Sequence, residues 1–206
     1  MTHMAERPAP PAPPKKMTYE QFLEWADEDT RAEWVDGEIV WMSPVSLTHQ
    51  TVALFLLRVF SDFVEAHQSG VVLYESFQMK TKRSGREPDI LFVSQANLSR
   101  LKENYLDGPA DLAVEVVSPE SQERDRVTKF SEYEQNGVGE YWLIDPLHEQ
   151  AEFYRRGSDG LFHAVPLNDD GTYRSAVLPG LWLRVAWLWQ KPLPSMTFVR
   201  KELGLP

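Results

Sequence analysis

Apolar residues recur three and four positions apart in three segments of the chain, a spacing typical of helices that bury one face. The predicted helices are Tyr19–Ala26, Leu47–His67 and roughly Ser118–Asn136. Thr18 and Gln21 have the spacing of a capping box at the start of the first helix. Gly70 and Gly137 follow the second and third helices, where a glycine commonly ends a helix.

Short apolar runs bounded by turn residues predict strands between and after these helices. The single strands are Val71–Met79, Asp89–Val93, Leu112–Val117, Glu140–Asp145 and Leu181–Trp189. Two hairpins are predicted at the turns Asp36-Gly37 and Gly157–Gly160, with arms Glu33–Val35, Glu38–Met42, Glu152–Arg156 and Leu161–Val165. The polar segment Lys80–Glu87 is expected to join the first two single strands. This order of elements predicts an α/β or α+β fold with a mixed sheet.

The length of 206 residues fits one domain with an appendage. Residues 1–16 are rich in Pro and Ala and predict a flexible tail, whereas residues 17–206 predict a single domain. The chain has no cysteine, which excludes disulfides, cysteine-ligated metals and a thiol nucleophile, so any metal must bind oxygen or imidazole. The net charge of −10 argues against coating of nucleic acid by bulk electrostatics. With no apolar run long enough for a membrane span and no signal-peptide pattern, we expect a cytoplasmic protein.

An acidic residue stands inside an apolar strand. Strand alternation places Glu115 on the same face as Ala113 and Val117, where an unpaired charge is costly. Asp89 begins the preceding strand-like run, and adjacent strands about 4.8 Å apart would bring both carboxylates to one cation. A hard-metal site is one interpretation. The other is that Asp89 caps a turn and Glu115 pairs with Arg124.

Lys129 stands beside the apolar line through Val127 and Phe130 on the third predicted helix, from where its long side chain could reach Glu115. A lysine whose pKa is lowered by burial and a neighbouring cation could orient or deprotonate a water for attack on a phosphodiester. The alternative is a solvated lysine that pairs with Asp125.

Several motifs occur together in this chain. They are Glu-Trp-Val-Asp-Gly-Glu at 33–38, Ser43-Pro44 followed by His49, Glu-Pro-Asp at 87–89, Asp-Leu-Ala-Val-Glu-Val-Val-Ser-Pro-Glu-Ser at 111–121, then Arg124, Asp125, Lys129 and Tyr133, and Gly-Val-Gly-Glu-Tyr-Trp-Leu-Ile-Asp-Pro at 137–146. In this combination the chain resembles the Uma2 family of restriction-endonuclease-like proteins, roughly over residues 18–165. Each motif alone is weak, and their combination is specific.

The resemblance implies membership of the PD-(D/E)XK nuclease superfamily. The implied fold is a restriction-endonuclease-like core with a mixed central sheet flanked by helices, here with added β-hairpins. Asp89 and Glu115 would be ligands of Mg²⁺ or Mn²⁺, with the Val116 carbonyl as a third. Val117 occupies the position of the motif's lysine, and similarity to the family suggests that Lys129 supplies the ammonium instead. If Lys129 points to solvent, the site would bind metal without cutting.

Other residues are candidates for supporting roles. Glu38 is either the additional acid that many nucleases of this superfamily place near the metal or a surface hairpin residue. His49 is either a proton donor or phosphate contact or the partner in a local hydrogen bond. Gln78 is a weaker candidate for supporting the metal ligands. A basic loop before Asp89 could contact phosphates. Its residues are Lys80, Lys82, Arg83 and Arg86.

The remaining motif residues are interpreted as structural. Tyr133 and Trp142 are expected to pack in the core, and Asp145 to form a turn at a strand end before Pro146. The C-terminal tryptophans are expected in the core or at a dimer surface. They are Trp182, Trp187 and Trp189.

The sequence therefore predicts a Mg²⁺- or Mn²⁺-dependent DNA endonuclease that forms a homodimer. Two alternatives stay open. One is an inactive nuclease-fold module for nucleic-acid binding or assembly, which the missing lysine at position 117 and the acidic net charge favour. The other is a sugar hydrolase that uses Asp89 and Glu115 as an acid and base pair.

Overall fold

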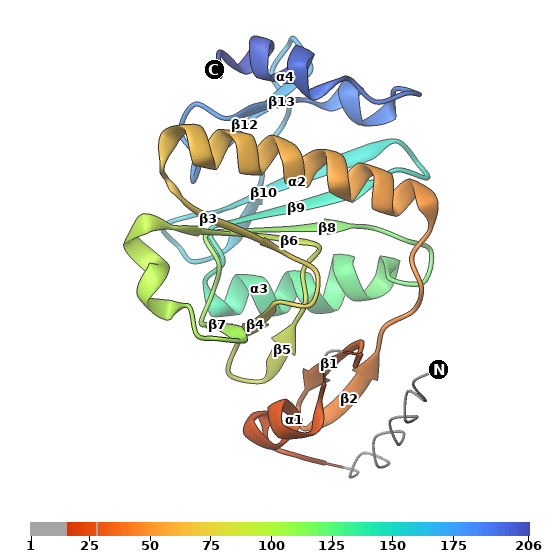
Figure 1. Cartoon of the computed structure of the whole chain (residues 1–206), viewed down its shortest axis with the longest axis vertical. Helices are drawn as coiled ribbons and strands as arrows, with labels where there is room; N and C mark the ends of the chain where they lie inside the picture. The colour runs from red at the N-terminus through yellow and green to blue at the C-terminus, as the bar shows by residue number, and fades with distance from the viewer. Residues whose placement is uncertain (1–15, 28) are drawn as a thin grey trace, which may run out of the picture.

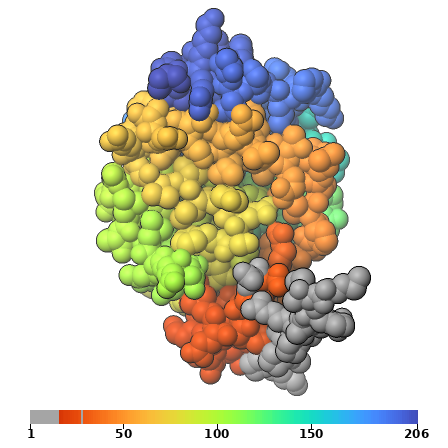
Figure 2. Space-filling view, viewed as in Figure 1, coloured from red at the N-terminus to blue at the C-terminus, as the bar shows by residue number. Residues whose placement is uncertain are grey.

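The computed structural model describes residues 16–27 and 29–206. The predicted tail at residues 1–16 therefore lies outside the described residues, apart from Lys16. A six-stranded sheet forms the centre, with α2 (Leu47–His67) on one face and α3 (Phe130–Asn136) on the other (Figure 1). The N-terminal and C-terminal segments lie at opposite ends of the molecule, with α2 between them (Figure 2).

The remaining helices are short. They are α1 (Tyr19–Trp25), α4 (Met196–Leu203), the 3-10 helices η1 (Gln95–Arg100) and η3 (Val185–Trp189), and the π-helical turn η2 (Arg124–Lys129) that leads into α3. The strands are β1 (Ala32–Val35), β2 (Glu38–Trp41), β3 (Gly70–Tyr74), β4 (Gln78–Lys80), β5 (Ser84–Arg86), β6 (Ile90–Ser94), β7 (Tyr105–Asp107), β8 (Leu112–Val116), β9 (Glu140–Asp145), β10 (Gln150–Arg156), β11 (Phe162–Ala164), β12 (Thr172–Arg174) and β13 (Trp182–Arg184). The predicted α+β class with a mixed sheet is confirmed.

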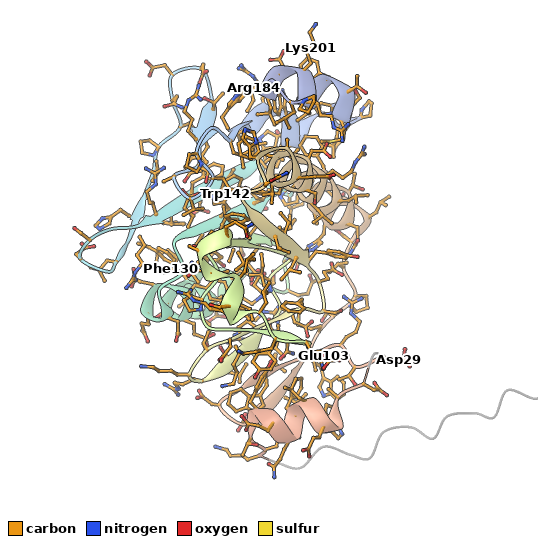
Figure 3. The ribbon with its side chains drawn as sticks, turned by 60° about the vertical axis from the view of Figure 1, so that its left-hand side comes forward. Asp29, Glu103, Phe130, Trp142, Arg184 and Lys201 are labelled. Atoms are coloured by element: carbon orange, nitrogen blue, oxygen red, sulfur yellow. The ribbon has the colours of Figure 1, made fainter. Side chains whose placement is uncertain are left out.

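The central sheet has the order β11-β10-β9-β8-β6-β3, and its one parallel pair is β8 with β9. Alternate residues of β8 divide between the two cores. Val114 packs with Trp142 and the apolar face of α2, whereas Ala113 packs with Tyr133 on the opposite face. Figure 3 shows Trp142 near α2 and Phe130 on the side of α3. This division places every second residue of β8 beneath α3.

A smaller sheet of order β2-β1-β5-β4-β7 lies beyond α3, at the N-terminal end of the molecule (Figure 1). The predicted hairpin of β1 and β2 is confirmed, and its turn residues Asp36 and Gly37 have φ of 51° and 91°, as a tight hairpin turn requires. In β5, a Cβ on Gly85 would lie 2.5 Å from both Gln78 Oε1 and the Tyr19 ring, so glycine permits this close approach.

Several predicted boundaries are wrong. The predicted strand Val71–Met79 splits into β3 and β4, which belong to different sheets, and the predicted linker Lys80–Glu87 contains β5. Gln68, in a left-handed conformation with φ of 48°, ends α2 in place of Gly70, which begins β3. Leu181–Trp189 is not one strand, because η3 follows β13 directly.

The third predicted helix begins later than expected. Ser118 and Ser121 exchange side-chain and backbone hydrogen bonds and form a turn before the helical segment. The strand β7 and the helix α4 have no counterpart in the sequence prediction. Within the described residues, no helix is long and apolar enough to cross a membrane.

Candidate functional site

A cavity of about 60 Å³ lies where β6 begins and β8 ends, beside the segment that leads into α2. The segment between β2 and α2 runs along one side of the molecule and passes this end of the sheet (Figure 1). Acidic and basic side chains line much of the cavity. They are His49, Glu87, Asp89, Glu115, Glu120, Arg124, Asp125 and Lys129.

Asp89 joins three elements at this cavity. Its Oδ2 accepts a hydrogen bond from the Val116 backbone N–H at 2.6 Å, which fixes this carboxylate, just before β6, against the end of β8. Its Oδ1 lies 3.1 Å from His49 Nε2 near the start of α2. Burial alone would lower the pKa of His49, but the hydrogen bond and the charge of Asp89 raise it above its usual value. The structure thus brings His49 and Asp89 together.

Glu115 is buried on the predicted face of β8, with Ala113 and Val117. Its Oε1 accepts hydrogen bonds from Lys129 Nζ and from the Tyr133 hydroxyl, both at 2.8 Å. The alternative pairing of Glu115 with an arginine is therefore wrong, because Glu115 pairs with a lysine.

Lys129 is only 1% exposed and points into the protein, so the alternative of a solvated lysine is wrong, although the pairing with Asp125 that it included is present. Its Nζ lies 2.8 Å from Glu115 Oε1, 3.2 Å from Glu33 Oε1 and 3.8 Å from Asp125 Oδ1. The expected lowering of its pKa depends on burial together with a neighbouring cation. Burial alone would lower the pKa of Lys129, but these three carboxylates raise it above its usual value. The side chain is therefore an ammonium.

The buried face of the helical segment differs from the predicted apolar line. Val127 is 62% exposed, whereas Asp125, Lys129 and Tyr133 are buried. The π-helical turn η2 is wider than a regular helical turn, so residues four positions apart lie nearly on the same face of the helix. This geometry places Asp125 and Lys129 on the inward face. Arg124 lies at the rim, with its Nε 3.9 Å from Asp125 Oδ1.

Negative charge exceeds positive charge in this site. Burial raises the pKa of Glu115 well above its usual value, and the neighbouring Asp125 and Asp89 raise it further while Lys129 opposes them. Burial also raises the pKa of Asp125, again with a contribution from Asp89. Several carboxylates that face one ammonium favour the binding of a further cation.

The donor atoms at the cavity suit a divalent cation. His49, Glu75 and Asp89 each offer a ligand atom, and these atoms lie within 4.8 Å of one another. Glu75, just after β3, also accepts hydrogen bonds from Gln50 at 3.0 Å and Arg31 at 3.2 Å. Carboxylate oxygens with one imidazole are suitable ligands for Mg²⁺ or Mn²⁺, so these residues fit the expected metal. The group contains Asp89 but not Glu115, the other expected side-chain ligand.

Sequence reasoning missed the role of Glu33 and misplaced Arg86. Glu33 is fully buried on β1, where its Oε2 accepts from Arg86 Nη1 at 2.8 Å and its Oε1 accepts from the Glu87 N–H at 3.1 Å. Burial alone would raise the pKa of Glu33, but Lys129 and Arg86 hold it at about 2. Arg86 is 2% exposed, so its expected place in an exposed phosphate-binding loop is wrong. An acid three residues before Asp36-Gly37, on an arm of the predicted hairpin, was the available signal.

The other basic residues lie on a different surface. Lys80, Lys82 and Arg83 line a shallow groove of about 630 Å³ beside α1, with Lys16. Arg83 forms an exposed ion pair with Asp36 at 2.6 Å. The groove does not share these residues with the cavity at Asp89.

Glu38 does not reach the site. It is exposed at the start of β2, opposite Val35, and is absent from the lining of the cavity. The expectation that Glu38 adds an acid near the metal is therefore wrong. Glu33 is the hairpin residue that faces the buried lysine, because it lies on the inward side of β1.

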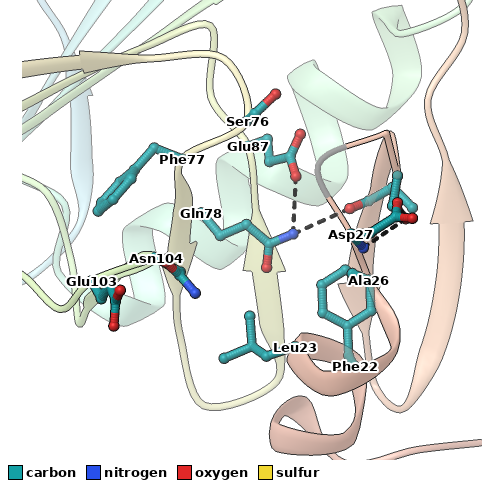
Figure 4. Close-up of a pocket in the computed structure, with 12 residues that line it drawn as sticks. Phe22, Leu23, Ala26, Asp27, Ser76, Phe77, Gln78, Glu87, Glu103 and Asn104 are labelled. Atoms are coloured by element: carbon teal, nitrogen blue, oxygen red, sulfur yellow. Dashed lines mark hydrogen bonds between the residues drawn. The ribbon is translucent and has the colours of Figure 1, made fainter. Parts of the chain in front are cut away.

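A second cavity of about 400 Å³ adjoins the first and shares Glu87 with it. Gln78 lines this second cavity, and its Nε2 donates to Glu87 Oε1 at 3.0 Å and to the Ala32 carbonyl at 3.1 Å (Figure 4). Burial raises the pKa of Glu87 above its usual value. Gln78 therefore holds a residue that lines the candidate site, in line with the supporting position predicted for it.

The residues interpreted as structural have packing or turn roles. Trp142 and Tyr133 are buried in the two cores, and Tyr133 also donates to Glu115. Asp145 Oδ1 accepts from the backbone of Leu147 and His148, as a turn former does. The C-terminal tryptophans pack in or against the core on the α2 side. They are Trp182, Trp187 and Trp189.

Comparisons with known proteins show the family and the fold of this chain. A family model named Uma2 and described as "Putative restriction endonuclease" matches residues 19–186. An uncharacterized protein of Synechocystis sp. is 24% identical over 155 residues, which cover 74% of this chain and 80% of that protein. A crystal structure described as "a putative nuclease belonging to DUF820" from Anabaena variabilis is similar with a TM-score of 0.71 and 17% identity, covering 84% of this chain and 97% of that one. The similarity to this structure confirms the expected restriction-endonuclease-like fold, and the match to the family model shows that the chain belongs to the Uma2 family.

Proposed function

We propose that this protein hydrolyses phosphodiester bonds in DNA with the help of Mg²⁺ or Mn²⁺. The observation that carries the proposal is the contact of Lys129 Nζ with Glu115 Oε1 at 2.8 Å, beside Asp89, which directly precedes the neighbouring strand β6. Two acids and a buried ammonium at one cavity provide ligands for a cation and a positive group for a phosphate. The absence of lysine at position 117 is thus compensated by a lysine from η2.

The metal would be held by Asp89, Glu115 and the Val116 carbonyl, with His49 and Glu75 as further donors beside Asp89. A divalent cation supplies Lewis-acid polarisation of a phosphoryl oxygen and neutralises negative charge. The Val116 N–H and His49 hold the two oxygens of Asp89 in place, which fixes the orientation of this carboxylate before any ligand arrives.

Lys129 acts on the phosphate as a cation. Because carboxylates keep its ammonium protonated, it donates hydrogen bonds to a phosphoryl oxygen and stabilises the negative charge that develops in the transition state. In this role Lys129 does not act as the base that deprotonates the attacking water. Tyr133 donates to the same Glu115 oxygen as Lys129 and so limits the rotation of that carboxylate.

The groove beside α1 is the proposed contact surface for the DNA backbone. Lys82 and Arg83 are exposed there, and Lys80 Nζ lies 4.9 Å from the centre of the Tyr19 ring. Exposed lysine and arginine side chains can bind DNA phosphates without recognising the base sequence. A homodimer is proposed as well, because two subunits with one site each would cut the two strands of a duplex. Light scattering that finds only a species of 23.7 kDa would contradict the dimer.

The test is nicking of supercoiled plasmid by the full chain with Mg²⁺ or Mn²⁺, with EDTA, and with EDTA followed by excess metal. The expected result is cutting that EDTA stops and metal restores. Asp89→Asn, Glu115→Gln and Lys129→Met should each lose cutting, whereas Lys102→Met, a change at an exposed lysine, should not. Cutting by all three variants at the parent's rate would overturn the proposal. Sugar hydrolysis that survives EDTA would favour the alternative of an acid and base pair.

A further inference from the structure

We propose that Glu33 of the N-terminal hairpin is a positioning residue that holds the Lys129 ammonium at the catalytic cavity. The inference rests on the proposed function and extends it to a residue outside the central sheet. Glu33 Oε1 lies 3.2 Å from Lys129 Nζ, and Glu115 Oε1 lies 2.8 Å from the same nitrogen. The lysine is therefore held by carboxylates from two different sheets.

Glu33 is itself fixed in place. Its Oε2 accepts from Arg86 Nη1 at 2.8 Å, and its Oε1 also accepts from the Glu87 N–H at 3.1 Å. Both oxygens are thus occupied, and Glu33 does not line the cavity at Asp89. These contacts suit a residue that acts through Lys129 and argue against a metal ligand.

Arg86 does not need the charge of Glu33 for its own neutralisation. Glu132 of α3 accepts from Arg86 Nε and Nη2, each at 2.7 Å, which is the paired geometry of a strong arginine–carboxylate contact. Glu33 therefore contacts two cations, Arg86 and Lys129, and Arg86 has a second carboxylate partner of its own in Glu132. A purely structural ion pair between β1 and β5 would not require this arrangement.

The physical effect is restriction of a flexible side chain. A lysine has four rotatable side-chain bonds and loses considerable conformational freedom when its nitrogen is fixed. With contacts from Glu33 and Glu115, Nζ is constrained before the substrate binds, which lowers the cost of orientation in the transition state. Without Glu33, Glu115 and the more distant Asp125, at 3.8 Å, would be left to hold the ammonium.

The test compares Glu33→Gln with Glu132→Gln in the full chain. Each variant replaces a carboxylate that contacts Arg86 by an amide of the same size, but Glu33 also contacts Lys129. The first readout is the ¹⁵N resonance of the Lys129 ammonium, assigned by its absence in Lys129→Arg. Glu33→Gln should shift this resonance and speed its hydrogen exchange with water at least about tenfold, whereas Glu132→Gln should leave both nearly unchanged.

The second readout is steady-state cutting of plasmid. Glu33→Gln should lower kcat by about 10- to 100-fold with KM within about twofold of the parent, because misorientation acts on the transition state. Glu132→Gln should lower kcat by less than about threefold. Circular dichroism and thermal melting show whether both variants are folded. Glu33→Asp keeps the negative charge, and its kcat should lie between those of Glu33→Gln and the parent.

The outcomes separate the two proposals. An unchanged Lys129 resonance in Glu33→Gln, or equal effects of the two glutamine variants, would overturn the positioning role even if the parent cuts DNA. A parent that cuts no DNA form with either metal would refute the proposed function. The ammonium resonance would still decide whether Glu33 holds Lys129.

Discussion

The ammonium of Lys129 donates a hydrogen bond of 2.8 Å to Glu115, although the lysine belongs to the π-helical turn η2 and the acid to the strand β8. The contact is buried on both sides, so neither charge can be satisfied by bulk water. Loss of one partner then leaves the other as an unpaired buried charge, which is strongly unfavourable. Stability and activity should therefore both depend on this pair.

Lys129→Met tests this dependence. The variant should lose plasmid cutting and should lower the free energy of unfolding by about 3 to 5 kcal/mol, because Glu115 and Glu33 lose a buried cation. Urea denaturation gives the stability change and the nicking assay gives the activity. Lys102→Met serves as the matched control at an exposed lysine, and a Lys129→Met protein as stable and active as the parent would contradict the expectation.

Asp89→Asn should weaken metal binding without unfolding the protein. The amide keeps an oxygen able to accept from the Val116 N–H, but it removes the charge that attracts a divalent cation. Titration calorimetry with Mn²⁺ should show an affinity at least about tenfold lower than that of the parent. Glu38→Gln removes an exposed acid outside the cavity and should bind Mn²⁺ as the parent does. Equal losses in both variants would place the metal elsewhere.

The two arginines of the predicted basic loop should behave differently. Arg86→Ala removes one of the two buried cations beside Glu33 and also the partner of Glu132, and should cost about 3 to 5 kcal/mol of unfolding free energy. Arg83→Ala removes an exposed arginine and should leave the free energy of unfolding nearly unchanged while weakening DNA binding and its dependence on salt. Chemical denaturation and fluorescence anisotropy with labelled DNA measure the two effects, and a strong loss of stability in Arg83→Ala would be inconsistent with its exposed position.

Acid should destabilise the fold through Glu33. Its pKa is about 2 in the folded protein and 4.5 in its ordinary state, so ionised Glu33 contributes stability that is fully present well above pH 4.5. This contribution is lost as the pH falls from 4.5 towards 2. In urea denaturation, the stability difference between the parent and Glu33→Gln should be larger at pH 6 than at pH 3 by on the order of 2 kcal/mol. A difference that does not change with pH would show that Glu33 is not charged in the fold.

The central part of the site could be predicted because its signals are local. Glu115 interrupts an apolar strand, and strand alternation alone gives the face on which it lies. Asp89 precedes the neighbouring strand, and the pairing of β6 with β8 brings the two acids together. These relationships need only the periodicity of strands and the adjacency of sequential elements.

The support of Lys129 could not be predicted, because it depends on contacts between distant segments. Arg86 is separated by 53 positions from Glu33, and no local pattern shows that an arginine after Ser-Gly is buried. The strand β5 has only three residues and no apolar side chain, so its sequence is typical of a loop. Val127 was expected inside because helical periodicity assumes a regular helix, and η2 departs from that geometry.

The wide turn of η2 controls the angular position of the lysine around the helix axis. In a regular helix each residue advances the side-chain direction by about 100°. Deletion of one residue between Asp125 and Lys129, inside η2, would return the turn towards regular winding and rotate Asp125 relative to α3. The π-helical turn therefore sets the direction of the Lys129 side chain. Because of this turn, the helical segment that follows β8 directs the Lys129 ammonium to the Glu115 carboxylate.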